Sequence, residues 1–192
     1  MHREAADALA ADDALAPLVE AHGPLALEPA EDIFERLVVS ILRQQVSMDA
    51  AAAIRERLFE SVDVTPSGIL AAESETLRAA GLSDAKVEYV SAAAEVFERR
   101  EYDRSSFEGM ETDAVIDELS DIRGVGPWTG KMFCLFCLGR PDVFPVEDLG
   151  VRKGMQTVID PEMSRSQMVT HATRWKPYRS YASLYLWRAT DG

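Results

Sequence analysis

The residues whose types and spacing could do chemistry lie in two short stretches, Leu119–Thr129 (LSDIRGVGPWT) and Pro145–Gly154 (PVEDLGVRKG). In the first stretch, the Gly-Val-Gly sequence at 124–126 predicts a tight turn between two helices. The second helix should open at Pro127, because proline is favoured at the first helical position. Its first N–H groups and the positive end of its dipole then point at whatever lies before it, which suits a phosphate.

The glycines of this turn allow two interpretations: they are required only by the geometry of the turn, or they belong to a DNA-binding motif. A Gly-x-Gly turn alone is weak evidence, because glycines at a corner between helices often serve geometry only. The longer pattern, in which Leu119 and Ile122 would pack the two helices together, is typical of the helix-hairpin-helix motif of DNA-binding proteins. We therefore expect DNA-backbone contacts, which position a protein without reading the base sequence. The expected contact residues are Gly124, Val125, Gly126, Thr129 and Lys131.

The distribution of charge favours the hairpin as the DNA contact. The 192-residue chain has a net charge of −13, which by itself argues against a nucleic-acid-binding protein. Residues 1–122 hold 27 acidic and 10 basic residues, whereas residues 123–192 hold 6 acidic and 10 basic ones. The positive part therefore begins at the hairpin. The abundance of acids, with only 4 lysines among the 20 basic residues, resembles proteins of salt-loving organisms, in which DNA binding would rely less on counterion release.

Several stretches together resemble the helix-hairpin-helix superfamily of DNA glycosylases, and within it the DNA-3-methyladenine glycosylase II family. They are SILRQQVSMDAAAAI, GLSDAKVEYV, the hairpin, FPVEDLGVRKG and RWKPYRSYASLYLWRAT, and they extend over residues 30–190. The resemblance implies a catalytic aspartate, and Asp148 occupies its position. Glu147 is the competing acid, but the Leu149-Gly150 pair that follows favours Asp148. Taken alone, Asp148 would be interpreted as a helix cap or a solvated acid.

A carboxylate suits the chemistry that the resemblance implies. Breaking an N-glycosidic bond builds positive charge on the sugar, and a nearby carboxylate stabilises that charge, typically by several kcal/mol, while it orients or deprotonates the attacking water. Relatives that also cut the strand carry a lysine at the position of Trp128, and the lysine amine attacks the sugar. Lys131 lies three residues further on and does not match that position. We therefore expect a monofunctional glycosylase, without lyase activity, for 3-methyladenine and 7-methylguanine.

The resemblance also indicates where the flipped base would bind. Alkylated purines are cationic and should stack well on an electron-rich indole. The expected base pocket consists of Trp128, Met132 one turn later, and Trp187, with core packing as the alternative for both tryptophans. Other aromatic residues that could adjoin this pocket are Trp175, Tyr178 and Tyr181.

The turn Gln44–Ser47 corresponds to the segment from which the family inserts a side chain into the gap left by the flipped base. Gln45 is the expected wedge and Gln44 is the second candidate. The best-known member of the family carries a bulkier apolar residue there. The alternative is a polar helix end whose amides satisfy backbone groups.

No cofactor is expected to be required. Hairpins of this kind often hold Na⁺ or K⁺ through backbone carbonyls, which here would be those of Ser120, Ile122 and Val125. Some related glycosylases hold an iron–sulfur cluster through four cysteines, and this chain has only two, so no such cluster is expected.

Cysteines and histidines offer no other metal site. Cys134 and Cys137 have the C-x-x-C spacing of a redox pair or half a zinc site, but they lie in an apolar run that predicts a buried helix. His2, His22 and His171 lack metal-ligand spacing and are expected at the surface or as caps.

Helices must position all these residues, because Ala, Leu, Glu and Arg dominate and no sustained two-residue alternation occurs. The predicted fold class is all-α: a bilobal bundle of about ten helices with a cleft between the lobes, forming one domain over residues 1–192 with the hairpin at 113–139. Helices are expected over Asp32–Gln44, from Ser47 through Glu60, from Pro66, from Ser74 to a break at Gly81, from Ser83 to Arg100, on both sides of the hairpin, from Ser164 and near Pro177. Asp103–Glu111 is expected to be a loop.

The expected partner is double-stranded DNA that contains alkylated bases. Two alternatives remain: a glycosylase for oxidised or deaminated bases, and a non-catalytic hairpin module that binds damaged DNA. No apolar run approaches the roughly 20 residues of a membrane span, and the N-terminus lacks the apolar core of a signal peptide. We expect a cytoplasmic, chromosome-associated monomer that resembles the short archaeal or yeast form of the family.

Overall fold

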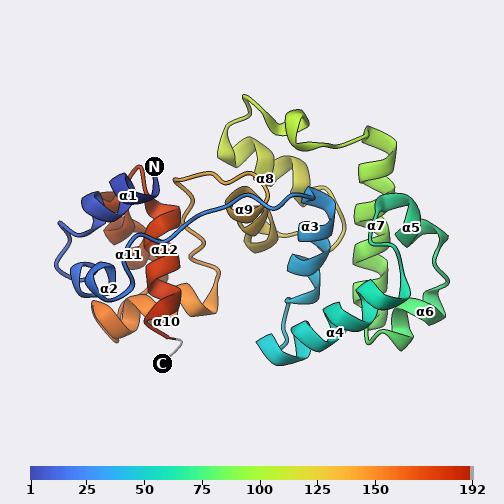
Figure 1. Ribbon diagram of the computed structural model, residues 1–192, viewed down its shortest axis with the longest axis horizontal. Coiled ribbons are helices and arrows are strands. Elements are labelled where there is room, and N and C mark those ends of the chain that lie inside the picture. The colour runs from blue at the N-terminus through green and yellow to red at the C-terminus, as the bar shows by residue number, and fades with distance from the viewer. Residues whose placement is uncertain (191–192) are drawn as a thin grey trace. The chain divides into compact units, whose positions relative to one another are not determined.

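A computed structural model describes residues 1–190, which form twelve α-helices and two 3₁₀-helices (Figure 1). No strand occurs among these residues, so the predicted all-α class is confirmed. The chain divides into two compact units. Unit 1 consists of Met1–Pro29 and Gly139–Gly192, and unit 2 consists of Ala30–Leu138. Unit 1 is therefore built from both ends of the chain.

Unit 2 contains the hairpin and the predicted wedge turn. Its helices are α3 (Ile33–Leu42), α4 (Met48–Ser61), α5 (Pro66–Ala71), α6 (Ser74–Ala79), α7 (Asp84–Arg100), η1 (Arg104–Phe107), α8 (Thr112–Ser120) and α9 (Pro127–Phe136). Asp32, Ser47 and Ser83 cap α3, α4 and α7, because each side-chain oxygen accepts a hydrogen bond from a first-turn N–H. These caps confirm three predicted helix starts.

The core of unit 2 is apolar and rich in aromatic rings. Helix α3 packs against both α7 and α9. Ring pairs join Phe34, Phe97, Phe133 and Phe107, with centroids 5.1 to 6.5 Å apart, in the tilted and edge-on geometries that aromatic pairs prefer. This core packs α3, the helix that precedes the wedge turn, against α7 and against α9, the second helix of the hairpin.

Unit 1 contains α1 (His2–Leu9), α2 (Ala16–His22), α10 (Leu149–Val158), α11 (Arg165–Ala172), η2 (Thr173–Trp175) and α12 (Arg179–Arg188). Helix α12 is the central element, since α1, α2 and α10 all contact it. Its Tyr181, Tyr185 and Leu186 are buried. His2 hydrogen-bonds the Tyr181 hydroxyl at 3.1 Å, so this histidine tethers α1 to α12 and is more than the surface residue that we expected.

Other predictions about the elements were correct or wrong in detail. Cys134 and Cys137 are buried and form no disulfide with each other, as predicted for core residues, and burial raises the pKa of the Cys137 thiol. The expected loop Asp103–Glu111 contains η1, and the helix expected near Pro177 begins at Arg179. Within residues 1–190, no helix is long and apolar enough to cross a membrane.

Candidate active site

Asp148 is the N-cap of α10, and its carboxylate is fixed by two donors. Its Oδ1 accepts a hydrogen bond from the backbone N–H of Val151 at 3.0 Å and another from the indole Nε1 of Trp187 at 2.8 Å. The helix-cap interpretation is thus correct, but it does not account for the indole, which comes from α12. Unit 1 therefore brings together two of the residues predicted from sequence, the catalytic aspartate and a tryptophan of the base pocket.

Two glycines of α10 make this contact geometrically feasible. A Cβ on Gly150 would lie 2.7 Å from Cδ1 of Trp187 and 3.1 Å from Oδ1 of Asp148, so any side chain there would press on the hydrogen-bonded pair. A Cβ on Gly154, one turn later, would collide with the backbone carbonyl of Leu186. Because neither position carries a side chain, α10 and α12 approach closely enough for the Trp187 indole to hydrogen-bond the Asp148 carboxylate.

The segment that leads to Asp148 is held by residues that the sequence did not single out. Buried Ser180 accepts a hydrogen bond from the Val143 N–H at 2.9 Å and donates one to the Arg140 carbonyl at 2.6 Å. The Arg179 guanidinium donates two hydrogen bonds to the Asp142 carboxylate, from Nε to Oδ1 at 2.6 Å and from Nη2 to Oδ2 at 3.0 Å. This bidentate geometry makes an arginine–carboxylate pair specific in its orientation. The partners are 37 to 40 residues apart, so no local pattern could have found them.

In unit 2 the hairpin has the predicted form, with α8 and α9 on either side of the turn. Gly124 has φ +85° and its missing Cβ would overlap the Tyr89 ring, so both conformation and space require glycine there. Gly126 differs, since φ is −104° and nothing lies within 4 Å of its missing Cβ. Helix α9 starts at Pro127, and its N-cap residue Gly126 has no side chain to cap the first-turn N–H groups, so the N-terminus of α9 suits an anion.

Two details of the predicted hairpin contact were wrong. The Val125 N–H does not point outward; it donates to the Ile122 carbonyl at 3.0 Å and closes the turn, with the side chain buried. The Thr129 side chain is also buried and accepts a hydrogen bond from Gln44. Both residues therefore shape the hairpin. The surface of the turn is formed by the exposed Arg123, which pairs with Glu88, by the two glycines and by Pro127, with the half-buried Lys131 in α9.

The predicted wedge turn is fixed to the hairpin by Gln44. Its Nε2 donates to the Gly124 carbonyl and to Thr129 Oγ1, both at 2.9 Å. The side-chain amide of Gln44 is thus bound within unit 2, so Gln44, the second wedge candidate, does not point toward DNA as predicted. Gln45 is exposed and has φ 56°, a left-handed conformation that non-glycine residues rarely adopt and that clusters at functional sites.

A buried lysine, Lys86, binds the end of α3, directly before the wedge turn. Lys86 is 8% exposed and its Nζ donates to the Leu42 carbonyl at 2.6 Å, at the last turn of α3. A cation at a helix C-terminus satisfies an unpaired carbonyl and complements the dipole, while burial lowers the pKa of the Lys86 amine. No local sequence pattern indicates this role, because Lys86 and Leu42 are far apart along the chain.

The predicted base-pocket residues have different environments. Trp128 and Trp187 are half-buried, as residues that present one face to a ligand would be. Met132 is only 5% exposed, so its side chain serves the core rather than an open pocket. Trp175 and Tyr181 are likewise buried in unit 1, and Trp175 and Tyr178 line a separate hollow that contains none of the predicted base-pocket residues Trp128, Met132 and Trp187.

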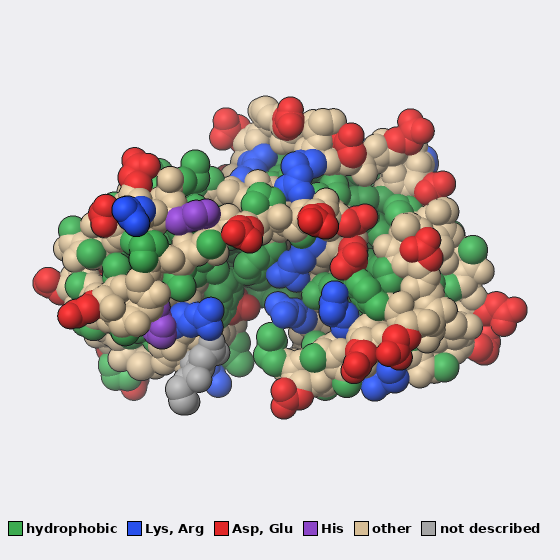
Figure 2. All heavy atoms as spheres, in the orientation of Figure 1, with side chains coloured by type: hydrophobic (Ala, Val, Ile, Leu, Met, Phe, Trp, Pro, Cys, Tyr) green, Lys and Arg blue, Asp and Glu red, His purple; other side chains and the backbone are tan. Residues whose placement is uncertain are grey.

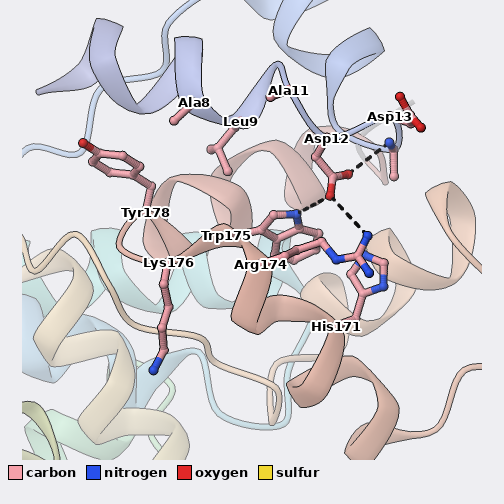
Figure 3. Close-up of a pocket in the computed structure, with 11 residues that line it drawn as sticks. Ala8, Leu9, Ala11, Asp12, Asp13, His171, Arg174, Trp175, Lys176 and Tyr178 are labelled. Atoms are coloured by element: carbon pink, nitrogen blue, oxygen red, sulfur yellow. Dashed lines mark hydrogen bonds and ion pairs between the residues drawn. The ribbon is translucent and has the colours of Figure 1, made fainter.

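Unit 1 has a hollow of about 550 Å³ that contains none of the predicted catalytic residues (Figure 3). At its centre Asp12 accepts a hydrogen bond from Trp175 Nε1 at 3.1 Å and pairs with Arg174 at 3.8 Å. His171 contributes a buried Nε2 that lacks a hydrogen-bond partner among residues 1–190. Burial lowers the pKa of this imidazole. His171 is therefore neither the surface residue nor the cap that we expected.

Comparison with known proteins defines the class. Residues 38–180 match the family described as HhH-GPD superfamily base excision DNA repair protein. The chain belongs to this superfamily.

Several individual proteins are similar to it over most of its length. It is 28% identical to DNA-3-methyladenine glycosylase 1 of Schizosaccharomyces pombe, covering 92% of this chain and 80% of that protein. It is 30% identical to DNA-3-methyladenine glycosylase 2 of Escherichia coli, covering 91% of this chain and 64% of that protein. This chain thus spans less than two thirds of the Escherichia coli relative.

Two solved structures have the same fold. The crystal structure of a DNA-3-methyladenine glycosidase from Bacillus halodurans has a TM-score of 0.80 and 34% identity, covering 96% of this chain and 87% of that one. The Schizosaccharomyces pombe 3-methyladenine DNA glycosylase Mag1, in complex with abasic DNA, has a TM-score of 0.88 and 28% identity, covering 96% and 95%.

Proposed function

We propose that this protein is a monofunctional DNA glycosylase of base excision repair, which hydrolyses the N-glycosidic bond of alkylated purines in double-stranded DNA. The observation that carries the proposal is the hydrogen bond of 2.8 Å from the indole Nε1 of Trp187 to the carboxylate of Asp148. The close packing of α10 on α12, which Gly150 and Gly154 permit, makes this hydrogen bond possible. The names of the relatives support the substrate class, and the DNA complex of Mag1 supports the partner.

Asp148 would act on the sugar. As the bond between C1′ and the base nitrogen breaks, its electron pair leaves with the base and positive charge grows at the sugar. The carboxylate stabilises that charge, and a water adds to C1′ and gives up a proton to Asp148 or solvent. Fixed charges in a partly dry site stabilise such transition states by several kcal/mol. The two hydrogen bonds to Oδ1 pre-orient the group, so little reorganisation accompanies the reaction.

The two half-buried tryptophans would receive the base. A cationic alkylpurine stacks favourably on an indole face, and Trp187 can offer its ring while its N–H holds Asp148. Trp128 stands where strand-cutting relatives have lysine, so no amine at that position can form a Schiff base. Lys131 lies three residues on. We therefore infer that the product is an abasic site in an uncut strand.

The hairpin and wedge turn would bind the DNA itself. The uncapped N-terminus of α9 donates to a backbone phosphate, Gly126 leaves room for that phosphate, and Lys131 adds charge. Gln45, exposed at a strained position, would fill the gap in the base stack. No cofactor is required in this scheme. A Na⁺ or K⁺ at the carbonyls of Ser120, Ile122 and Val125 stays a prediction; the Ile122 carbonyl accepts one hydrogen bond and has a second lone pair to offer.

The test is release of free base from methylated DNA by wild type, Asp148→Asn and Glu147→Gln, from low to molar salt. Asparagine can still cap α10 and accept the Trp187 N–H, so Asp148→Asn removes the charge with little effect on folding. Glu147→Gln is the matched control, one residue away. We expect wild type and Glu147→Gln to release 3-methyladenine and 7-methylguanine without cutting the strand, and Asp148→Asn to be slower by at least about a hundredfold.

Other outcomes would redirect the proposal. Equal release by wild type and Asp148→Asn would show that Asp148 is not the catalytic acid. Absence of release at every salt concentration would favour another lesion class or a binding module. Activity that persists at molar salt would support the salt-adapted enzyme that we infer from the composition.

A further inference from the structure

Lys86 is unusual in this chain because its charge is buried. Among residues 1–190 it is the only charged residue that is buried. The other charged side chains are exposed or half-buried, and Figure 2 shows acidic and basic groups scattered over one face of the molecule. Because moving an ammonium group out of water is costly unless it is well paired, the contact that Lys86 makes should explain why the fold keeps it.

The amine of Lys86 binds the end of α3. The last backbone hydrogen bond at this end runs from the Gln44 N–H to the Ile41 carbonyl at 3.2 Å. The next carbonyl, that of Leu42, accepts a hydrogen bond from Lys86 Nζ at 2.6 Å. A charged donor forms a stronger hydrogen bond than a neutral one and complements the negative end of the helix dipole. The ammonium group therefore takes the place of a further backbone N–H, and the chain can leave the helix at this point.

The wedge turn that follows contains a strained residue. Gln45 has φ 56°, and a non-glycine residue keeps such a left-handed conformation only where the surrounding structure fixes it. Before Gln45, the Lys86 amine holds the end of α3 and the Gln44 amide binds the hairpin. After Gln45, Ser47 caps α4. The turn is thus held on both sides, and Lys86 supplies the contact from α7.

Helix α7 also contacts the hairpin. Tyr89 lies three residues after Lys86, on the same face of the helix. Its ring lies against Gly124, where a Cβ would be 2.1 Å from the ring carbon Cγ. Glu88 pairs with Arg123 of the hairpin turn at 2.6 Å. Helix α7 therefore contacts both the wedge turn and the hairpin, the two elements that the proposed function assigns to DNA binding.

We propose that Lys86 is a positioning residue for base flipping, which holds the wedge turn so that Gln45 can enter the gap left by the flipped base. This role rests on the proposed function of Gln45. Because the turn is already fixed before DNA binds, less conformational freedom is lost when the side chain enters the gap. The amine is buried, so Lys86 acts on DNA only through the turn.

The experiment uses a duplex that carries an abasic-site analogue with 2-aminopurine opposite it. The fluorescence of 2-aminopurine depends on its stacking, so a side chain that enters the gap changes it. The signal is read at saturating protein, where a difference in affinity no longer contributes. We expect a clear change with wild type, almost none with Gln45→Gly, and less than half of the wild-type change with Lys86→Met.

The matched control is Ile69→Val, which removes a buried methyl group from α5, a helix that packs against α7. It should keep the full fluorescence change. On methylated duplex DNA, Lys86→Met should lower the single-turnover rate of base release by about tenfold, as expected for the loss of a hydrogen bond from a charged group. Ile69→Val should stay within about twofold of wild type.

Lys86→Gln keeps the test decisive if Lys86→Met does not fold. Its amide keeps an N–H donor but ends one bond short of the position of Nζ, so its fluorescence change should also be reduced. A full change with the Lys86 variants would overturn the proposal, and so would an equal loss with Ile69→Val or no change with wild type. If wild type releases no base but the Lys86 variants still lose the fluorescence change, Lys86 positions the wedge and the glycosylase function fails.

Discussion

The hairpin of unit 2 and the α10–α12 contact of unit 1 both depend on a pair of glycines, but they use them in different ways. At the α10–α12 contact, Gly150 and Gly154 both face atoms of α12. Any Cβ there would push the two helices apart, so these glycines serve the fold and, through it, the Trp187–Asp148 hydrogen bond. The geometry of the proposed catalytic carboxylate is thus built into the packing of unit 1.

At the hairpin only one of the two glycines is needed by the fold. Gly124 is required by its positive φ and by the Tyr89 ring, whereas Gly126 has ordinary backbone angles and open space around its missing Cβ. Glycine weakens a fold relative to alanine wherever nothing requires it. A glycine that the protein itself does not need is explained by an external partner, which we propose to be the DNA backbone. The comparison predicts that mutations in the two regions separate stability from binding.

The largest effect should come from Gly154→Ala. The added methyl group collides with the rigid Leu186 carbonyl, and overpacking of this kind costs about 3 kcal/mol or more. The free energy of unfolding, measured by denaturant titration, reports it. Gly126→Ala is the control and should change that free energy by less than about 0.5 kcal/mol. Equal stability of the two variants would remove the distinction between the regions.

Next in size is Trp187→Phe, which keeps an aromatic face but removes the donor to Asp148. A hydrogen bond to a charged group contributes about 1.5 kcal/mol, so the single-turnover rate of base release should fall about tenfold. Affinity for an abasic-analogue duplex should stay near that of wild type, because the hydrogen bond acts on the carboxylate. Tyr178→Phe, elsewhere in unit 1, is the matched control. A loss of affinity as large as the loss of rate would show that the indole binds DNA rather than positions Asp148.

What could be predicted from the sequence depended on the distance over which each interaction acts. Ser47, Ser83 and Ser164 were predicted as caps because a cap reaches only two or three residues along the chain. The aspartate was found from its resemblance to a family motif. Its role as a helix cap was one of the interpretations open from the sequence, whereas its hydrogen bond from the Trp187 N–H required the folded chain.

The predictions that failed involve side chains whose partners are distant in sequence or whose surroundings are set by packing. Gln44 was considered as a wedge, yet it bonds Gly124, 80 residues away. Thr129 was expected to contact DNA, yet the same amide and the core of unit 2 enclose it. The roles of Lys86 and Ser180 had no sequence signal for the same reason. A linear pattern shows which residues are present at a turn but not which of them point inward.

The smallest effect, and the sharpest test of the comparison, is that of Gly126→Ala on DNA binding. The methyl group meets no atom of the protein, so the fold should be intact, but it occupies the space into which a phosphate would fit at the N-terminus of α9. Losing one such backbone contact should cost about 1 kcal/mol, or about fivefold in affinity for an abasic-analogue duplex. Fluorescence anisotropy measures the affinity and a thermal melt checks the fold. Val169→Ala, an exposed position on α11, is the control. If Gly126→Ala binds DNA as tightly as wild type, the open space at Gly126 serves no DNA contact, and the distinction between the two glycine pairs disappears.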